Sequence, residues 1–277
     1  MYFDYHTHTE FSDDSVYDME ECVKDAIALG IEEMCFTDHV DYGIKKDWVE
    51  GNIIYRDGEP MANVDYPAYF QKLAYVQDKY KDQITIKKGL EFGMQMHTID
   101  QYEKLIEKYP LDFVILSVHQ VNNKEFWTYD FQKDYDEPGY YRAYYEELYQ
   151  LVTHYHHYCV LGHMDLLKRY DDHDGYHSFE ANKDLITKIL QCVIDDGKGI
   201  ELNTSSVRYG LDCLMPSREI LQLYHDLGGT VLTIGSDSHS KQHLENAHIP
   251  ELMQTLKDIG FQKICTFDKM KPIFHDL

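Results

Sequence analysis

Short apolar runs alternate with longer segments of helical periodicity from one end of the chain to the other. The apolar runs predict seven strands, with a candidate eighth at the end: Met1–His6, Glu33–Asp38, Thr85–Glu91, Asp112–His119, Cys159–His163, Gly199–Asn203, Thr230–Ser236 and Lys263–Phe267. Helices are predicted between them at Asp18–Leu29, Tyr66–Tyr80, Asp100–Tyr109, Tyr140–His156, Phe179–Asp195, Ser217–Leu227 and Pro250–Ile259. This alternation is typical of parallel strands that are joined by helical crossovers.

The strand–helix steps form one unbroken series without a low-complexity linker, which favours a single closed α/β barrel over a doubly wound open sheet. We therefore expect one domain over residues 1–277. Two longer polar stretches, Asp41–Asp65 and Gln120–Glu137, follow the carboxyl ends of the second and fourth predicted strands. In a barrel, these loops would overhang the mouth of the active site.

The composition is that of a folded protein, with 43% hydrophobic and 27% charged residues. The formal net charge is -23, from 49 acidic and 26 basic residues, so the average surface repels nucleic-acid phosphates and anionic lipid. We expect no nucleic-acid partner and no membrane partner. A small phosphate ester remains compatible, because bound divalent cations would cancel several negative charges locally.

The six cysteines are scattered and form no CxxC pair and no disulfide framework. The amino-terminal segment has no signal-peptide pattern, and no apolar run has the length of a membrane span. These features predict a cytoplasmic protein. No sequence pattern indicates an oligomeric state.

Histidines and carboxylates gather where the predicted strands end. They are His6, His8, Asp38, His39, Glu91, His119, His163, Asp165, Asp237 and His239. Residues two apart on a strand share a face, so His6 with His8, and Asp237 with His239, could each present two ligands to one cavity. Imidazole and carboxylate together suit zinc, iron or manganese, and the set is larger than one tetrahedral ion needs.

The sequence therefore predicts two or three divalent cations, with Glu91 placed to bridge a pair. Two ions about 3.5–4 Å apart can deprotonate a water and hold a phosphate ester for in-line attack. Other interpretations of these carboxylates remain open. Asp38 and Asp165 could orient the neighbouring histidine instead of binding a cation, and Asp237 could be a helix N-cap. The histidines His154, His156 and His157 close a helical stretch and are expected on a solvated face.

Six motifs carry a family resemblance: HTHTEFSDDS, FTDH, GLEFG, SVH, LGHMD and SDSH, in this order. The series resembles the polymerase and histidinol phosphatase (PHP) family of metal-dependent hydrolases, and it spans Tyr5 to about Ser240. The segments HMDLLKRY and ELNTSSVRYG are most similar to the histidinol-phosphatase branch of that family.

The resemblance implies a distorted (β/α)7 barrel with up to three metal sites, zinc being the expected metal and iron or manganese the alternatives. His6, His8, Glu91 and Asp237 would hold the first ion. Glu91 would bridge to the second ion, which His119 and His163 complete, and Asp14, His39 and His239 would hold the third. Some family members have a histidine where this chain has Asp14.

The resemblance also implies the reaction, which is hydrolysis of L-histidinol phosphate to L-histidinol and phosphate in histidine biosynthesis. Glu91, Asp237 and His239 would form the catalytic centre, and His39 would also face the substrate. Arg169 and Arg208 both follow strand ends and are candidates for binding the phosphate, because a guanidinium can donate two parallel hydrogen bonds to it. Without the resemblance, each could equally be a surface ion pair.

Glu125, in the second polar stretch, is a weaker candidate for contacting the substrate's amine. Two competing functions are considered. One is a PHP phosphoesterase that acts on nucleotides or on another small phosphate ester. The other is a non-catalytic, metal-stabilised domain, which the complete set of nine ligand candidates disfavours.

Overall fold

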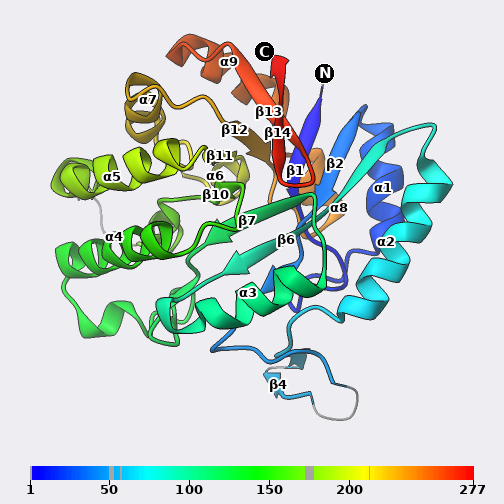
Figure 1. Ribbon diagram of the computed structural model, residues 1–277, viewed down its shortest axis with the longest axis horizontal. Coiled ribbons are helices and arrows are strands. Elements are labelled where there is room, and N and C mark those ends of the chain that lie inside the picture. The colour runs from blue at the N-terminus through cyan, green and yellow to red at the C-terminus, as the bar shows by residue number, and fades with distance from the viewer. Residues whose placement is uncertain (1, 50–52, 57, 172–177, 212) are drawn as a thin grey trace.

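In a computed structural model, the chain forms a nearly closed barrel of seven parallel strands surrounded by helices (Figure 1). The structure describes residues 2–49, 53–56, 58–171, 178–211 and 213–277. In spatial order, which is also chain order, the barrel strands are β1 (Phe3–Thr7), β2 (Glu33–Phe36), β6 (Thr85–Gly93), β7 (Phe113–Ser117), β10 (Val160–Leu161), β11 (Gly199–Asn203) and β12 (Leu232–Gly235). The predicted (β/α)7 barrel is confirmed.

The barrel closes through backbone hydrogen bonds between the ends of its first and last strands. The amide of Asp237 donates to the carbonyl of His6 (2.7 Å), and the amide of His8 donates to the carbonyl of Ser238 (2.8 Å). Closure of the barrel therefore brings the segment of His6 and His8 beside the segment of Asp237 and His239, and these are four of the predicted ligands.

Helices follow the strands and cover the outside of the barrel (Figure 1). The longer ones are α1 (Met19–Ala28), α2 (Tyr66–Tyr80), α3 (Ile99–Lys108), α4 (Glu137–His154), α5 (Ser178–Asp195), α7 (Arg218–Asp226) and α9 (Ile249–Ile259). Three of them begin at an aspartate cap: the side chain of Asp18 accepts from two amides of the first turn of α1, and Asp65 and Asp136 each accept from one amide, of α2 and α4 respectively. Their apolar faces pack on strands that are mostly buried, as both faces of a parallel sheet require.

The candidate eighth strand is a strand, but it does not join the barrel. It forms β13 (Lys263–Asp268), which pairs antiparallel with β14 (Lys271–Asp276). Phe267 of β13 packs against Phe113 with 5.0 Å between ring centroids, and the amide of Met270 donates to the carbonyl of Asp112. Since Asp112 precedes β7 and Phe113 begins it, the hairpin covers the amino end of the barrel, away from the predicted ligands.

Both long polar loops lie at the carboxyl end, as expected. The first follows β3 (His39–Val40), which pairs with β6, and contains the hairpin β4 (Tyr55–Arg56) with β5 (Glu59–Pro60); the second contains the hairpin β8 (Gln120–Val121) with β9 (Lys124–Glu125). Short helical turns, unpredicted, add to this end: η1 (Met96–Thr98), η2 (Gln132–Asp134), η3 (Leu166–Tyr170), α6 (Ser205–Arg208) and α8 (Lys241–Glu245).

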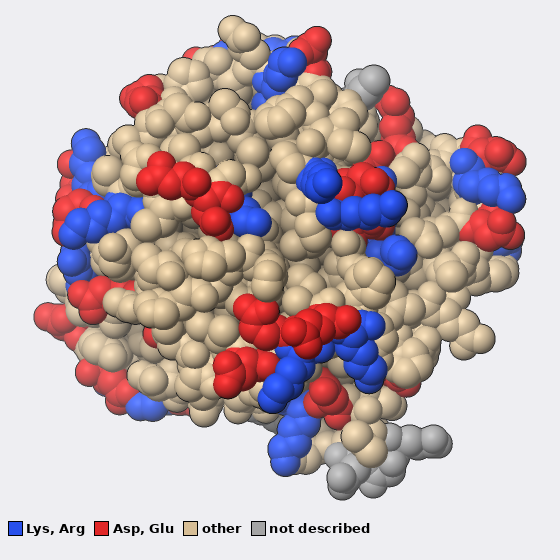
Figure 2. Space-filling model, viewed as in Figure 1, with Lys and Arg blue, Asp and Glu red and all other residues tan. Residues whose placement is uncertain are grey.

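Basic and acidic side chains are interspersed on the face that Figure 2 shows, and Lys and Arg do not gather there into a broad patch. This distribution agrees with the expectation that the protein does not bind nucleic acid, which stays a prediction. Among the residues that the structure describes, no helix combines the length and the apolar character needed to cross a membrane.

Candidate metal centre

The structure brings all nine predicted ligands together at the carboxyl end of the barrel, although they come from six separate parts of the chain. Eight of them are largely buried. Asp14, with 56% of its side chain exposed, is the exception, and it lies at the outer edge of the cluster. Such a concentration of imidazoles and carboxylates is costly to bury unless a cation or a full set of hydrogen bonds satisfies it.

Glu91 lies at the centre, and its two oxygens face different histidines. Oε1 accepts from Ser117 Oγ (2.7 Å) and lies 2.8 Å from His163 Nε2 and 3.2 Å from His119 Nε2. Oε2 lies 3.2 Å from His6 Nε2 and 3.0 Å from His39 Nδ1. A carboxylate that divides its oxygens between two groups of imidazoles has the geometry that a bridging ligand needs.

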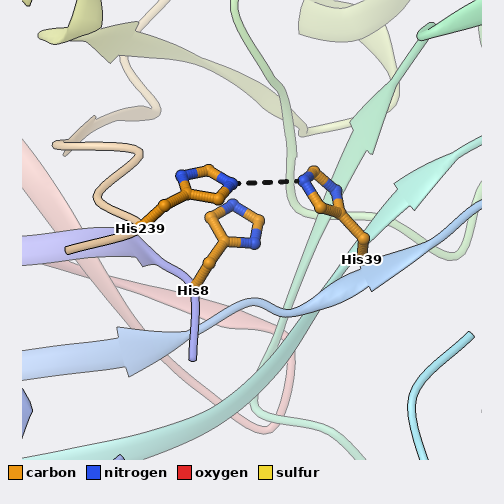
Figure 3. Close-up of side chains that lie close together, drawn as sticks. All are labelled: His8, His39 and His239. Atoms are coloured by element: carbon orange, nitrogen blue, oxygen red, sulfur yellow. Dashed lines mark hydrogen bonds between the residues drawn. The ribbon is translucent and has the colours of Figure 1, made fainter. Parts of the chain in front are cut away.

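A second group of histidines forms the outer part of the cluster. Figure 3 shows His8, His39 and His239 with their rings facing one another. Nε2 of His239 lies 3.5 Å from Nε2 of His39, and both nitrogens approach Oδ2 of Asp14, at 3.2 and 3.5 Å respectively. Asp14, His39 and His239 are the ligands predicted for the third ion.

Four of the histidines donate their Nδ1 proton to a supporting carboxylate, hydroxyl or backbone carbonyl and turn Nε2 inward. His6 donates to Glu201 Oε1 (2.6 Å), His119 donates to Asp41 Oδ1 (2.8 Å), and His239 donates to the carbonyl of Asp237 (2.9 Å). This arrangement fixes the tautomer that leaves a lone pair on Nε2, as in metal-bound histidines generally.

His8 is the fourth. Its Nδ1 lies 3.0 Å from Ser12 Oγ, and that hydroxyl donates in turn to Asp38 Oδ1 (2.8 Å). Because the Ser12 proton is committed to Asp38, the hydroxyl accepts from His8. Asp38 thus supports the cluster without facing it, but through Ser12 it orients the imidazole of His8 and not, as predicted, that of His39, whose contact with Ser12 is through the backbone amide.

The residues fit divalent cations. Five buried atoms of these nine residues form no hydrogen bond in the described part of the chain: Nε2 of His6 and His8, Nδ1 of His39 and His163, and Oε2 of Glu91. Three-residue groups such as His6–His8–Asp237 and His6–Glu91–His163 have donor atoms within 4.8 Å of one another. Nitrogen and oxygen donors at this spacing suit zinc, iron or manganese.

The electrostatics of the metal-free cluster favour the metal-binding protonation states of Glu91 and His8. Burial alone would raise the pKa of Glu91, but His6 and His119 hold it well below its usual range. Burial, together with neighbouring His239 and His39, holds the pKa of His8 well below its usual value, so its imidazole is neutral. An ionised carboxylate and a neutral imidazole are the protonation states that bind metals. Burial alone would lower the pKa values of His6, His39 and His119, but nearby carboxylates raise them, so these imidazoles release a proton when a cation binds.

Two supporting carboxylates were not predicted. Glu201, buried in β11, accepts from His6 and also from the amide of His163 (3.0 Å). Asp41, in the first long loop, holds His119. Glu201 could have been found, because it lies two residues before Asn203 in an otherwise apolar strand and must therefore share a face with it. Asp41 could not, because only the fold brings its loop beside β7.

Two expectations need correction. Asp165 does not contact His163: it accepts from the amide of Ser217 (2.9 Å) and pairs with Lys168, so it anchors η3 to the start of α7. Asp237 and His239 do not continue a strand, because β12 ends at Gly235 and Asp237 has a left-handed backbone with φ of 55°. Asp237 is not an N-cap either, since Ser240 caps α8.

Both candidate arginines lie beside Asp237 and line a cleft of about 390 Å³ that opens over the cluster. Arg169 Nη2 donates to Asp237 Oδ2 (2.5 Å), and Arg208 Nη2 donates to the carbonyl of Asp237 (3.1 Å). Both guanidiniums approach the ring of Tyr209. The surface ion-pair interpretation is therefore wrong for Arg169, whose side chain is only 7% exposed.

Glu125 and Trp127 of the second loop also line the cleft. The predicted contact between Glu125 and the substrate requires this position. The histidines at the end of α4 lie elsewhere. His156 and His157 are exposed and pair with Asp196 and Glu103, respectively, as expected of a solvated face.

Comparisons with known proteins agree with this site. Residues 4–205 match the model of the PHP domain family, and the chain belongs to that family. It is 31% identical to the histidinol-phosphatase of Lactococcus lactis over 97% of this chain and 95% of that protein. It is 29% identical to a probable histidinol-phosphatase of Thermotoga maritima, with 96% of each chain covered.

A solved structure of histidinol phosphate phosphatase from Lactococcus lactis, complexed with zinc, L-histidinol and phosphate, has a TM-score of 0.84 to this chain. It is 29% identical in sequence and covers 98% of both chains. A second structure, of a putative histidinol phosphatase from Listeria monocytogenes, shares the fold with a TM-score of 0.74 and 23% identity.

Proposed function

We propose that this protein is a metal-dependent phosphatase that hydrolyses L-histidinol phosphate to L-histidinol and phosphate in histidine biosynthesis. The observation that carries the proposal is the convergence of the nine ligands around Glu91, with inward-facing Nε2 atoms and the two arginines at the edge of the same cleft. The substrate assignment is supported by the Lactococcus relative, which has nearly the same length and a structure with L-histidinol and phosphate bound.

The proposed ligand sets are His6, His8, Glu91 and Asp237 for one ion, Glu91, His119 and His163 for a second, and Asp14, His39 and His239 for a third. Two or three zinc ions bound there would supply an activated water and neutralise negative charge on the phosphate. We also propose that the catalytic domain extends over residues 1–277, because Asp237 and His239 lie beyond the segment that matches the family model.

The chain's own residues bind and orient the phosphate ester. Arg169 and Arg208 approach the cleft from η3 and α6, and their guanidiniums can donate to phosphate oxygens as negative charge builds on them. Asp237 holds Arg169 in place through a buried ion pair, while its other oxygen faces His6 and His8 at 3.8 and 3.5 Å. Asp237 thereby connects the phosphate-binding side of the cleft to the ligands.

A comparison of substrates tests the proposal. Phosphate release should be measured for L-histidinol phosphate, for nucleoside monophosphates and for a short oligonucleotide, with the same zinc-loaded protein. We expect the highest kcat/KM for L-histidinol phosphate. A preference of more than about tenfold for either rival, which is about 1.4 kcal/mol of transition-state stabilisation, would refute the substrate assignment.

A further inference from the structure

A buried lysine is linked through two carboxylates to two of the proposed cation sites. Nζ of Lys45, in the first long loop, pairs with Asp13 Oδ1 at 2.5 Å and with Asp41 Oδ2 at 2.8 Å. Its side chain is only 9% exposed, and those of its partners are 12% and 5% exposed. An ammonium is seldom buried to this degree unless carboxylates surround it.

On one side, the lysine reaches the second proposed site through Asp41. The oxygen of Asp41 that Lys45 does not contact accepts from Nδ1 of His119 (2.8 Å), and Nε2 of His119 faces Glu91 at 3.2 Å. The fit is tight, because a Cβ atom at Gly93 would lie 1.8 Å from Asp41 Oδ1 and 2.6 Å from His119 Nδ1. Only glycine at this position leaves room for the carboxylate and the imidazole to meet.

On the other side, the lysine reaches the third proposed site through the loop after β1. Asp13 precedes Asp14, whose carboxylate approaches His39 and His239. Asp14 is the most exposed of the nine ligands, and its short loop is held to the rest of the cluster through Asp13 and Lys45. Lys45 thus connects the loop that carries the predicted ligand Asp14 to Asp41, which orients the predicted ligand His119.

We propose that Lys45 is a positioning residue of the metal centre, which holds Asp41 against His119 and holds the loop of Asp14 beside His39 and His239. The charge matters as well as the shape. Without the ammonium, Asp13 and Asp41 would be two mostly buried carboxylates with no cation between them, and such unpaired charges move apart. A displaced Asp41 would release His119 from its orientation.

This inference rests on the proposed metal sites, so the wild-type protein is measured first. Zinc bound per chain, zinc affinity by competition with a chelator, kcat, KM and the unfolding temperature of the metal-free protein are compared for wild type, Lys45→Met, Lys45→Arg and Lys46→Met. Lys46 is the matched control, because it is the adjacent lysine and is exposed. Failure of the wild type to bind zinc would refute the metal sites themselves, independently of Lys45.

We expect Lys45→Met to weaken zinc binding and to lower kcat by about 10- to 100-fold, as loss of an outer partner of a metal ligand usually does, with a smaller change in KM. Lys45→Arg, which keeps the charge, should recover most of both quantities, and Lys46→Met should equal the wild type. A purely structural role would lower only the unfolding temperature. Wild-type zinc affinity and kcat in Lys45→Met, or equal losses in Lys46→Met, would overturn the proposal.

If Lys45→Met yields no folded protein, Asp13→Asn decides. This variant keeps Lys45 and the shape of its partner but removes one of the two charges that hold the ammonium. We expect folded protein whose zinc affinity is reduced by about threefold or more, in the direction of the Lys45 effect. Unchanged zinc affinity in Asp13→Asn would overturn the proposal.

Discussion

Replacing Glu91 with glutamine tests the bridging role most directly, because the side chain keeps its size and loses one oxygen. An amide can place its oxygen toward only one group of histidines. If the oxygen stays with Ser117, His119 and His163, the NH2 group faces His6 and His39, where Oε2 now lies 3.2 and 3.0 Å from their nitrogens. An NH2 group cannot bind a cation there.

The expected loss of metal affinity in Glu91→Gln can be scaled from the effect of a milder change at a metal site. Loss of an outer partner reduces metal affinity by about 10- to 100-fold. Loss of a direct ligand should cost at least about 100-fold for each ion, which is about 2.8 kcal/mol per ion and between 5 and 6 kcal/mol, roughly, for a bridged pair. We therefore expect turnover below about 1% of the wild-type value and a clear loss of bound zinc.

The assay combines phosphate release from L-histidinol phosphate, zinc per chain by elemental analysis after gel filtration, and thermal unfolding to confirm that the variant is folded. Glu103→Gln is the matched control, because Glu103 is a partly exposed carboxylate that also pairs with a histidine, His157. A folded Glu91→Gln protein with full zinc content and near wild-type turnover would refute the bridging role.

Three further predictions concern the surroundings of Glu91. Arg208→Ala should raise KM for phosphate esters by roughly 10- to 150-fold, because it removes a charge-assisted contact worth about 1.5–3 kcal/mol, and wild-type KM would return Arg208 to a surface role. Gly93→Ala should lower both turnover and the free energy of unfolding, the latter by about 1–3 kcal/mol, because its Cβ overlaps Asp41 Oδ1; a thermal scan showing no change would contradict that overlap. Zinc affinity should rise with pH up to about 9: burial alone would lower the pKa of His119, but Glu91 and Asp41 raise it to about 9 in the metal-free protein, so zinc must displace a proton below that value. Chelator competition between about pH 6 and 9 measures this slope, and a pH-independent affinity would show that His119 does not bind zinc.

Some of the site follows directly from the order of residues along the chain. Histidines and carboxylates recur where apolar runs end, and in a parallel barrel all strand ends of one kind meet at one rim. His6, Glu91 and His163 could therefore be placed together before their separation was known. The ordered motifs around them also identified the family correctly.

Other features were decided only by tertiary structure, because they depend on loops and on backbone geometry that local patterns do not encode. The pairing of Asp41 with His119 requires a loop to fold back over β7, and the position of Asp237 requires a left-handed backbone where a strand was expected. The run Lys263–Phe267 was correctly predicted as a strand, but its partner is β14, which was not predicted, and not the barrel, since a β-pattern specifies a pleated, half-buried surface and not which edge it joins. Sequence by itself determined which residue types reach the rim of the barrel; the fold decided which atoms of those residues face one another, because that depends on contacts between segments far apart in the chain.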